Sequence, residues 1–164
     1  MRNVIYLGMG SNVGDRAENI IFALSVLQSG GFVDVKKISS FYETYPIGPK
    51  QRKFYNIAVK ATASLNPQKL LSLIKQTESL MGRKKTLRWG PRIIDIDILF
   101  FNNIVIAEKN LTVPHKEIQN RLFVLAPLNE ISGNFICPLS NKKISRILSE
   151  KLLTLRCQKV KILG

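Results

Sequence analysis

Two aspartates separated by one residue stand in an apolar stretch, RIIDIDILF at residues 92–100. Side chains alternate between the faces of a β-strand, so we expect Asp95, Asp97 and Leu99 on one face and Phe100 on the other. Carboxylates at i and i+2 lie roughly 6–7 Å apart at their Cβ atoms, close enough to bind one or two hard cations. Mg²⁺ prefers oxygen ligands of this kind, completed by water and phosphate oxygens. The alternative is an ordinary amphipathic strand with a solvated acidic face.

Basic residues come directly before this strand. The stretch RKKTLRWGPR at residues 83–92 contains five basic side chains, among them Arg88 and Arg92, and Trp89 offers a stacking surface. Arginines beside a metal held by carboxylates are typical of sites that handle phosphate. Such a loop is either solvated or closes over a bound polyphosphate.

The net charge is concentrated in the same region. The chain has 164 residues with 25 Lys+Arg and 11 Asp+Glu, a formal net charge of +14. Residues 50–92 carry +10, residues 93–141 carry −2 and residues 142–164 carry +6. A small polyanion, a nucleic acid or a membrane surface could each meet the basic block. We interpret the C-terminal +6 as a solvated helix face.

Two further polar residues interrupt the apolar pattern. Glu78 shares a helical stripe with Leu70, Ile74 and Met81, where a buried carboxylate is costly unless it is paired. It either lies at the edge of the stripe and reaches water, or accepts a hydroxyl or an arginine of the basic loop. His115 follows a proline in LTVPH; it is either structural or a donor to phosphate.

Composition excludes several classes of protein. With 45% hydrophobic residues the chain is not disordered, and its length suits one domain, residues 1–164. Two cysteines, Cys137 and Cys157, and one histidine are too few for a structural zinc site. We expect two reduced thiols. Since neither a run of ~20 apolar residues nor a signal peptide is visible, we expect a cytoplasmic protein.

Hydrophobic periodicity predicts the order β-α-β-β-α-β. Strands are expected at about residues 4–7, 33–39, 54–63 and 93–101, and helices from the cap at Asp15 to Gly30 and from Asn66 to Gly82. Ser11 and Asn12 are interpreted as turn residues. A hairpin near 102–113, a short helix near 116–121, a Leu/Pro-rich segment and a last helix at about 141–155 follow. This order predicts an α+β, ferredoxin-like sandwich with a C-terminal extension: helices cover one face of an antiparallel sheet, and loops or a site line the other.

The stretch RWGPRIIDIDILFF at residues 88–101 closely resembles the signature of the 6-hydroxymethyl-7,8-dihydropterin pyrophosphokinase family. The resemblance extends in colinear order over about residues 4–135. It also includes the segments YLGMGSNVGD, SSFYETYPIGP, FYNIAV, the E-x-x-x-G-R from Glu78 to Arg83, LTVPH and NRLFVLAPLNEI.

The resemblance implies a transferase of folate biosynthesis that moves pyrophosphate from MgATP to the hydroxymethyl group of the pterin and releases AMP. It implies that Asp95 and Asp97 hold two Mg²⁺ ions. The residues that match catalytic positions are Arg83, Arg92, Asp95 and Asp97. Those that match ATP-binding positions are Glu78, Lys85, Arg88, Trp89, Arg92, Ile98, Thr112, His115 and Arg121. Those that match pterin-binding positions are Thr44, Ile47, Phe54, Asn56, Trp89, Asp95 and Phe123, with the pterin between Phe54 and Phe123.

Four positions depart from the family pattern. Lys85 stands where many members have a second loop arginine and cannot make bidentate contacts. Asn110 and Lys116 replace an arginine and an aromatic residue common near ATP, and Phe54 lacks the hydroxyl of a tyrosine. These departures bear on affinity rather than on the reaction.

The alternative function is an RNA-binding module on the same layout, with the +10 block as a phosphate track. Such modules carry an aromatic RNP-like run, which this sequence lacks, and paired aspartates would repel RNA unless a metal covered them. We therefore expect small-molecule partners, ATP and the pterin, and no nucleic acid or membrane partner. We expect a monomer.

Overall fold

The computed structural model describes residues 2–83, 90–155 and 158–163. The strands are β1 (Asn3–Ser11), β2 (Val33–Ile38), β3 (Phe41–Thr44), β4 (Phe54–Ala63), β5 (Asp95–Phe101), β6 (Ile106–Ala107), β7 (Thr112–Val113), β8 (Ile136–Cys137), β9 (Lys142–Lys143) and β10 (Val160–Leu163). The helices are α1 (Arg16–Ser29), α2 (Pro67–Leu80), α3 (Leu122–Ser132) and α4 (Ile144–Thr154), with the 3₁₀ turn η1 at Ile118–Asn120.

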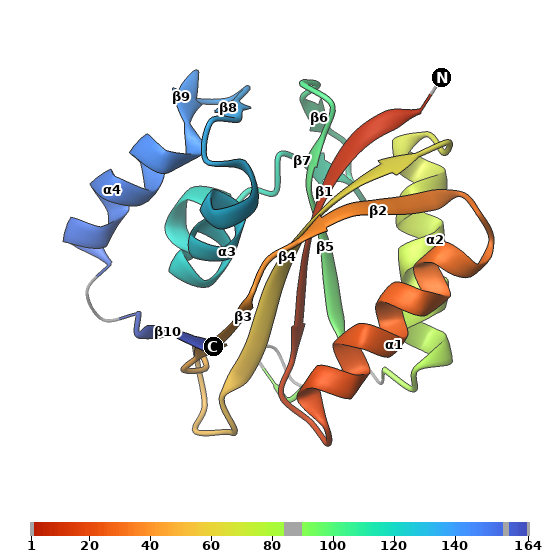
Figure 1. Ribbon diagram of the computed structural model, residues 1–164, viewed down its shortest axis with the longest axis horizontal. Coiled ribbons are helices and arrows are strands. Elements are labelled where there is room, and N and C mark those ends of the chain that lie inside the picture. The colour runs from red at the N-terminus through yellow and green to blue at the C-terminus, as the bar shows by residue number, and fades with distance from the viewer. Residues whose placement is uncertain (1, 84–89, 156–157, 164) are drawn as a thin grey trace.

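A twisted antiparallel sheet forms the centre of the molecule (Figure 1). Its strand order is β10-β3-β4-β1-β5, and β2 pairs with the other half of β4. The long central strands β1 and β4 pair along their whole length, from Asn3↔Ala63 to Ser11↔Tyr55. The chain is therefore α+β with an antiparallel sheet, and the bounds predicted for the strand at residues 54–63 are confirmed.

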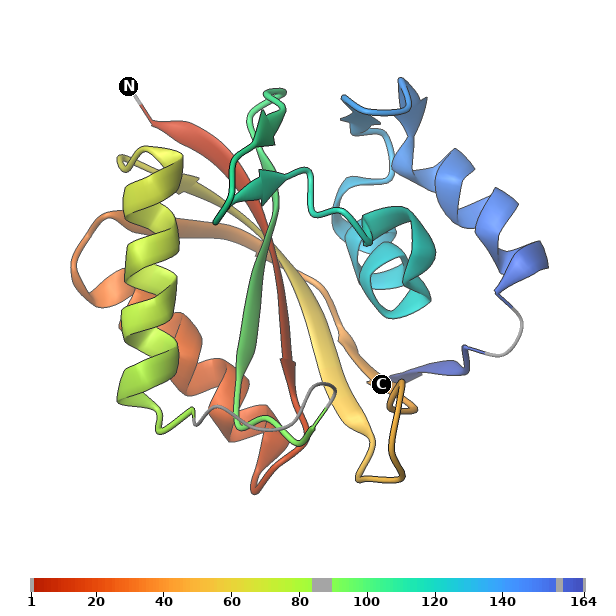
Figure 2. The ribbon, with the colours of Figure 1, turned by 180° about the vertical axis from the view of Figure 1, so that it is seen from behind.

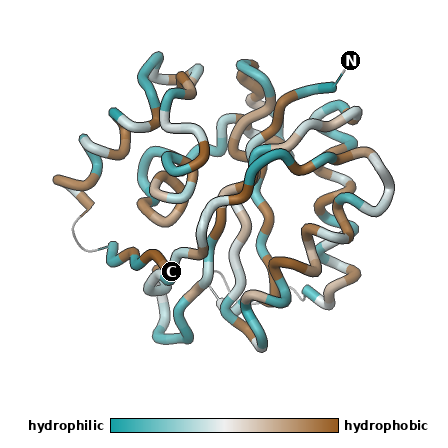
Figure 3. Tube along the Cα trace, viewed as in Figure 1, coloured by the Kyte–Doolittle hydropathy of each residue, from teal (hydrophilic) through white to brown (hydrophobic). Residues whose placement is uncertain are grey.

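Helices α1 and α2 cover one face of the sheet, as predicted (Figures 1 and 2). Both begin at capping residues that the sequence indicated. The Asp15 carboxylate accepts the N–H of Glu18 at 3.1 Å, and the Asn66 side chain accepts the N–H of Lys69 at 2.8 Å, just before Pro67. The buried stripes of the two helices meet alternate residues of the strands in a first hydrophobic core. In Figure 3 these central strands carry long hydrophobic stretches.

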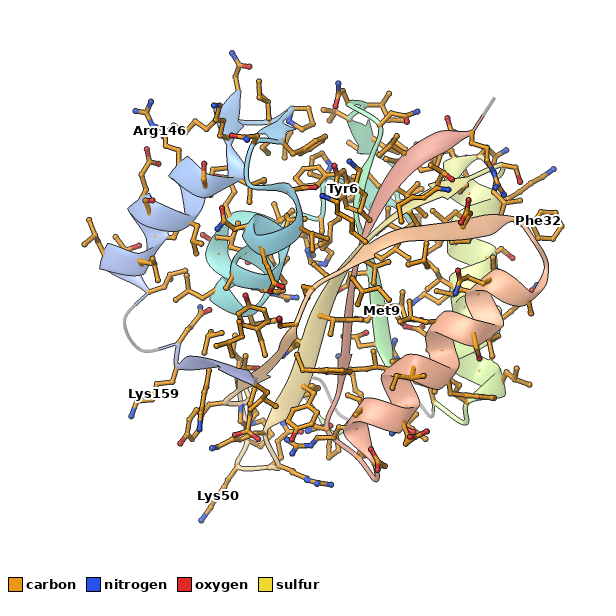
Figure 4. All side chains as sticks on the ribbon, viewed as in Figure 1. Tyr6, Met9, Phe32, Lys50, Arg146 and Lys159 are labelled. Carbon is orange, nitrogen blue, oxygen red and sulfur yellow. The ribbon has the colours of Figure 1, made fainter. Side chains whose placement is uncertain are left out.

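The opposite face is partly covered by α3, α4 packs on the outer side of α3, and both helices contribute to a second core (Figure 2). The Leu/Pro-rich segment, for which no helix was predicted, forms α3 with Pro127 inside it. Tyr6 packs edge-on against Phe100, with ring centroids 5.9 Å apart, and lies on the α3 side of β1, whereas Met9 belongs to the core under α1 (Figure 4). The prediction that only loops or a site would line this face was wrong for the half under α3.

A β-bulge in β5 corrects the predicted facing of Phe100. Tyr6 pairs with Phe100 and Leu7 with Ile98, so Leu99 is an extra residue between the two pairs. Leu99 and Phe100 consequently both face the second core, and Phe100 lies on the same side of the sheet as the two aspartates. Strict alternation had placed Phe100 on the opposite side.

The remaining elements lie at the ends of the sheet. The predicted hairpin is present as β6 and β7, and the predicted short helix is the 3₁₀ turn η1. The sequence did not indicate β10, which adds to the sheet edge by pairing with β3. In the residues that the structure describes, no helix has both the length and the apolar composition needed to cross a membrane.

Candidate active site

A cavity opens on the sheet face that α3 leaves uncovered. It holds about 820 Å³ of space, part of it open to solvent. The predicted site residues that line it are Thr44, Ile47, Phe54, Asn56, Arg92, Asp95, Asp97, Arg121 and Phe123. They come from β3, β4, β5 and the start of α3 and from the loops beside them, so the fold brings together most of the positions that the sequence indicated.

The two aspartates of β5 line the cavity, as alternation predicted. Asp95 forms ion pairs with two arginines, at 2.8 Å to Arg83 and 2.5 Å to Arg92. Asp97 lies 3.9 Å from Nε2 of His115. Burial and the neighbouring Asp95 charge raise the pKa of Asp97, while the nearby His115 and Arg121 act in the opposite direction.

Glu78 belongs to α2, the helix that packs against β5, which carries the aspartates. Its side chain is 4% exposed, forms ion pairs with Lys75 and Arg83, and accepts the N–H of Ile96 at 2.9 Å. Because Arg83 also contacts Asp95, a chain of charges runs from α2 to the cavity. The prediction that Glu78 accepts an arginine of the basic loop is confirmed; the predicted contact with ATP stays a prediction.

The donor set around the two aspartates fits magnesium. Among residues 2–83, 90–155 and 158–163, no group of three or more Asp, Glu, His or Cys side chains is arranged to hold a metal ion. Two carboxylates on one strand face still suit Mg²⁺, which is typically bound by one or two carboxylates and completed by water and substrate phosphates. Asp95 and Asp97 are therefore the residues that would hold it.

A buried amide closes one end of the cavity. Nδ2 of Asn56 donates to Oγ1 of Thr44 at 2.7 Å, and both residues are buried. A Cβ on Gly10 would lie only 2.6 Å from Oδ1 of Asn56, so this glycine leaves the space in which the amide sits. Hydrogen-bonding groups inside an otherwise apolar cavity are the usual means of orienting a small ligand.

The cavity walls are aromatic and basic. Phe54 and Ile47 line it near β3 and β4, and Arg121 and Phe123 line it at the start of α3. The guanidinium carbon of Arg121 lies 5.7 Å from the centroid of the Phe123 ring. A flat polar molecule and an anionic group could thus be bound side by side.

Other predicted residues lie away from this cavity. The side chain of Ile98 is buried in the core under α1 and α2, and Thr112, Asn110 and Lys116 are exposed. Their predicted ATP contacts, or effects on ATP affinity, stay predictions. The predictions for Lys85, Arg88 and Trp89 fall outside the described residues.

Sequence reasoning missed the role of Asn12, which it interpreted as a turn residue. Asn12 is 2% exposed, and its Oδ1 accepts the N–H of Arg92 at 2.7 Å. Its Nδ2 donates to Oε1 of Gln51 and to the carbonyl of Arg52, at 2.9 and 3.0 Å. The Asn12 amide therefore connects its own loop to the loop of Gln51 and to the loop of Arg92. Its position directly after a buried strand was the available signal.

Paired carboxylates flanked by arginines, in a cavity with a fixed amide and aromatic walls, define a class of enzyme that transfers a phosphate-containing group to a small polar substrate.

Comparison with known proteins gives the family. Residues 6–133 match the 7,8-dihydro-6-hydroxymethylpterin-pyrophosphokinase (HPPK) family model. The 2-amino-4-hydroxy-6-hydroxymethyldihydropteridine pyrophosphokinase of Bacillus subtilis is 48% identical over 132 residues, which are 80% of this chain and 79% of that protein. The protein of the same name from Aquifex aeolicus is 43% identical over 159 residues, 96% of this chain and 98% of its own. The chain belongs to the HPPK family and is a pyrophosphokinase.

A solved structure shares the fold. The Plasmodium falciparum HPPK-DHPS A437G structure superposes with a TM-score of 0.78 at 19% identity, covering 95% of this chain and 46% of the longer one.

Proposed function

We propose that this pyrophosphokinase transfers the pyrophosphoryl group of MgATP to the hydroxymethyl group of 6-hydroxymethyl-7,8-dihydropterin, a step of folate biosynthesis. The substrate hydroxyl oxygen forms a bond to the β-phosphorus of ATP and loses its proton. The bond from that phosphorus to the oxygen bridging it to the α-phosphorus breaks, and AMP leaves. The observation that supports the proposal most directly is that the carboxylate pair, the arginines and the buried amide line the same cavity.

The phosphate side of the site consists of β5 and its neighbours. Asp95 and Asp97 would hold magnesium, two ions in our proposal, which supplies neutralisation of phosphate charge when bound. Arg92 and Arg121 line the same cavity and can donate bidentate hydrogen bonds to phosphate oxygens. Because little covalent chemistry is asked of the protein in such transfers, positioning and charge account for most of the catalysis.

The pterin side consists of β3, β4 and α3. Asn56 and the backbone around Thr44 and Ile47 would meet the amino-pyrimidine edge, because an amide presents both a donor and an acceptor. Phe54 and Phe123 would contact the ring faces. In this proposed arrangement the hydroxymethyl group would point toward the aspartates, which line the same cavity.

We further propose that the sheet is ferredoxin-like. The strand order β2-β4-β1-β5, with α1 and α2 on one face, supports this assignment. We also propose that the protein acts as a monomer.

A product assay tests the proposed reaction. The protein is incubated with ATP, Mg²⁺ and the hydroxymethyl-dihydropterin, and nucleotides are separated. AMP is expected only when the pterin is present, with an equal amount of the pterin diphosphate. ADP as the product, or no product, would contradict the proposal. A tight, salt-sensitive RNA complex without AMP formation would instead favour the RNA-binding alternative.

A further inference from the structure

The segment at residues 158–163 touches both walls of the cavity but lies outside the residues that match the family model. It comprises Gln158, Lys159 and β10, and in Figure 4 the Lys159 side chain marks its position at the sheet edge. The net charge of the C-terminal residues gave no indication of a role. The contacts of the segment with both walls of the cavity indicate a role.

The side-chain amide of Gln158 bonds the backbone on both sides of Arg121. Its Oε1 accepts the N–H of Leu122 at 2.8 Å, and its Nε2 donates to the carbonyl of Asn120 at 2.9 Å. The two backbone groups differ in kind, one a donor and one an acceptor, so the orientation of the amide is determined by its partners. These two bonds fix the extended backbone of Arg121, whose φ is −125° and ψ 103°.

This contact satisfies the first backbone N–H of α3, at a helix start that has no side-chain cap of its own. Arg121 is the N-cap residue of α3, a position at which Ser, Thr, Asp or Asn usually accepts a backbone N–H. A guanidinium has donors only and cannot do so. Gln158 accepts the N–H of Leu122 from 36 positions further along the chain, and the Arg121 side chain lines the cavity.

The same segment also fixes the other wall. β10 pairs antiparallel with β3, from Val160↔Thr44 to Leu163↔Phe41. The Lys159 ammonium lies 5.9 Å from the centroid of the Tyr45 ring, and Thr44 and Tyr45 both line the cavity. Six consecutive residues therefore connect the start of α3 to the end of β3.

We propose that Gln158 is a positioning residue of the pyrophosphokinase site. Its amide holds the backbone of Arg121 and Leu122, and thereby positions Arg121 and the next residue, Phe123, at the cavity. β10 anchors Gln158 to the opposite wall. The role assigned to Arg121 and Phe123 rests on the function proposed above. The contacts of Gln158 do not depend on that function.

Substitution of Gln158 in the full-length chain tests the proposal. Gln158→Met keeps the length of the side chain and removes both hydrogen bonds; we expect KM for ATP and for the pterin to rise about tenfold, with kcat changed less than about threefold. Gln158→Glu keeps the acceptor for Leu122 but places an oxygen against the Asn120 carbonyl, so we expect a partial rescue. Gln76→Met, at an exposed position of α2, is the matched control and should behave as wild type.

Two readouts separate positioning from a general loss of stability. In an Arg121→Ala background, Gln158→Met should raise KM for ATP less than it does alone, because the two residues act in one network. Hydrogen exchange of the Leu122 amide should accelerate in Gln158→Met and not in Gln76→Met, whether or not the protein turns over.

Unchanged KM values together with unchanged Leu122 exchange would overturn the inference. Equal effects of Gln158→Met with and without Arg121 would overturn the link to the arginine. An inactive wild type would refute the proposed function alone, because the exchange experiment still decides whether Gln158 caps α3.

Discussion

Removing the charge of Glu78 should reveal how strongly the buried carboxylate ties α2 to β5. Glu78→Gln keeps the shape and an acceptor for the Ile96 N–H but loses the charged contact with Arg83. Hydrogen bonds to charged groups contribute about 1.5–3 kcal/mol, and Arg83 is only 22% exposed, so we expect a loss of about 2 kcal/mol. Lys75 is 58% exposed and adds little.

Glu78→Leu should cost more. It also leaves the Ile96 N–H buried without its acceptor, which adds about 1–3 kcal/mol, for a total of ~3–5 kcal/mol. The free energy of unfolding is measured by urea denaturation, and the Gln variant should lower Tm by roughly 4–8 °C. Glu150→Gln is the control, because Glu150 pairs with Lys142 and Arg146 at the surface and should leave Tm almost unchanged.

Three results would each contradict part of this account of Glu78. If Gln and Leu variants unfold at the same urea concentration, the hydrogen bond to Ile96 contributes nothing. If both variants unfold at the same urea concentration as the wild type, the ion pair with Arg83 contributes nothing either. A loss confined to the Leu variant would assign the whole effect to Ile96.

Three further predictions concern the cavity and the contact between β3 and α3. Asp97→Asn should reduce turnover at least about a hundredfold with an unchanged far-ultraviolet spectrum, whereas the control Asp34→Asn, at a half-exposed position of β2, should not; equal activities would remove the metal assignment. Gly10→Ala should raise KM for the pterin by displacing the Asn56 amide, measured by initial rates at saturating ATP, and an unchanged KM would exclude that amide from binding. Burial and the hydrogen bond to Glu130 raise the pKa of Tyr42 to about 12. The stabilisation that this pair contributes is therefore complete below about pH 10 and declines from there toward pH 12. An ultraviolet difference titration against Tyr42→Phe measures the midpoint, and a value near 10 would contradict this prediction.

Local rules predicted most of the sheet and the two helices that cover it. Asp15 and Asn66 cap the helices that follow them because the acceptor and the N–H it binds lie three residues apart in the sequence. Alternation placed Asp95 and Asp97 together on one face, which is the cavity face, for the same reason, since neighbouring positions alone decide the face of a regular strand.

Long-range contacts account for what was missed. The start of α3 has no capping residue of its own, since its acceptor comes from Gln158, and Pro127 inside the helix argued against it. Asn12 was interpreted as a turn residue because its partners Arg92 and Gln51 are remote in the sequence. No local pattern distinguishes these cases.

The extra residue Leu99 makes the effect of a deletion in β5 depend on its position. Upstream of it the odd-numbered residues face the cavity, and downstream the even-numbered Phe100 faces the same side. Deleting Leu99 would make the pairing with β1 regular and would leave Asp95, Asp97 and Phe100 on the same side, while the second core would lose one apolar side chain. Deleting Ile96 instead would place Asp95 and Asp97 on opposite faces, so the strand should accept the first deletion with a loss of stability and lose its carboxylate pair with the second.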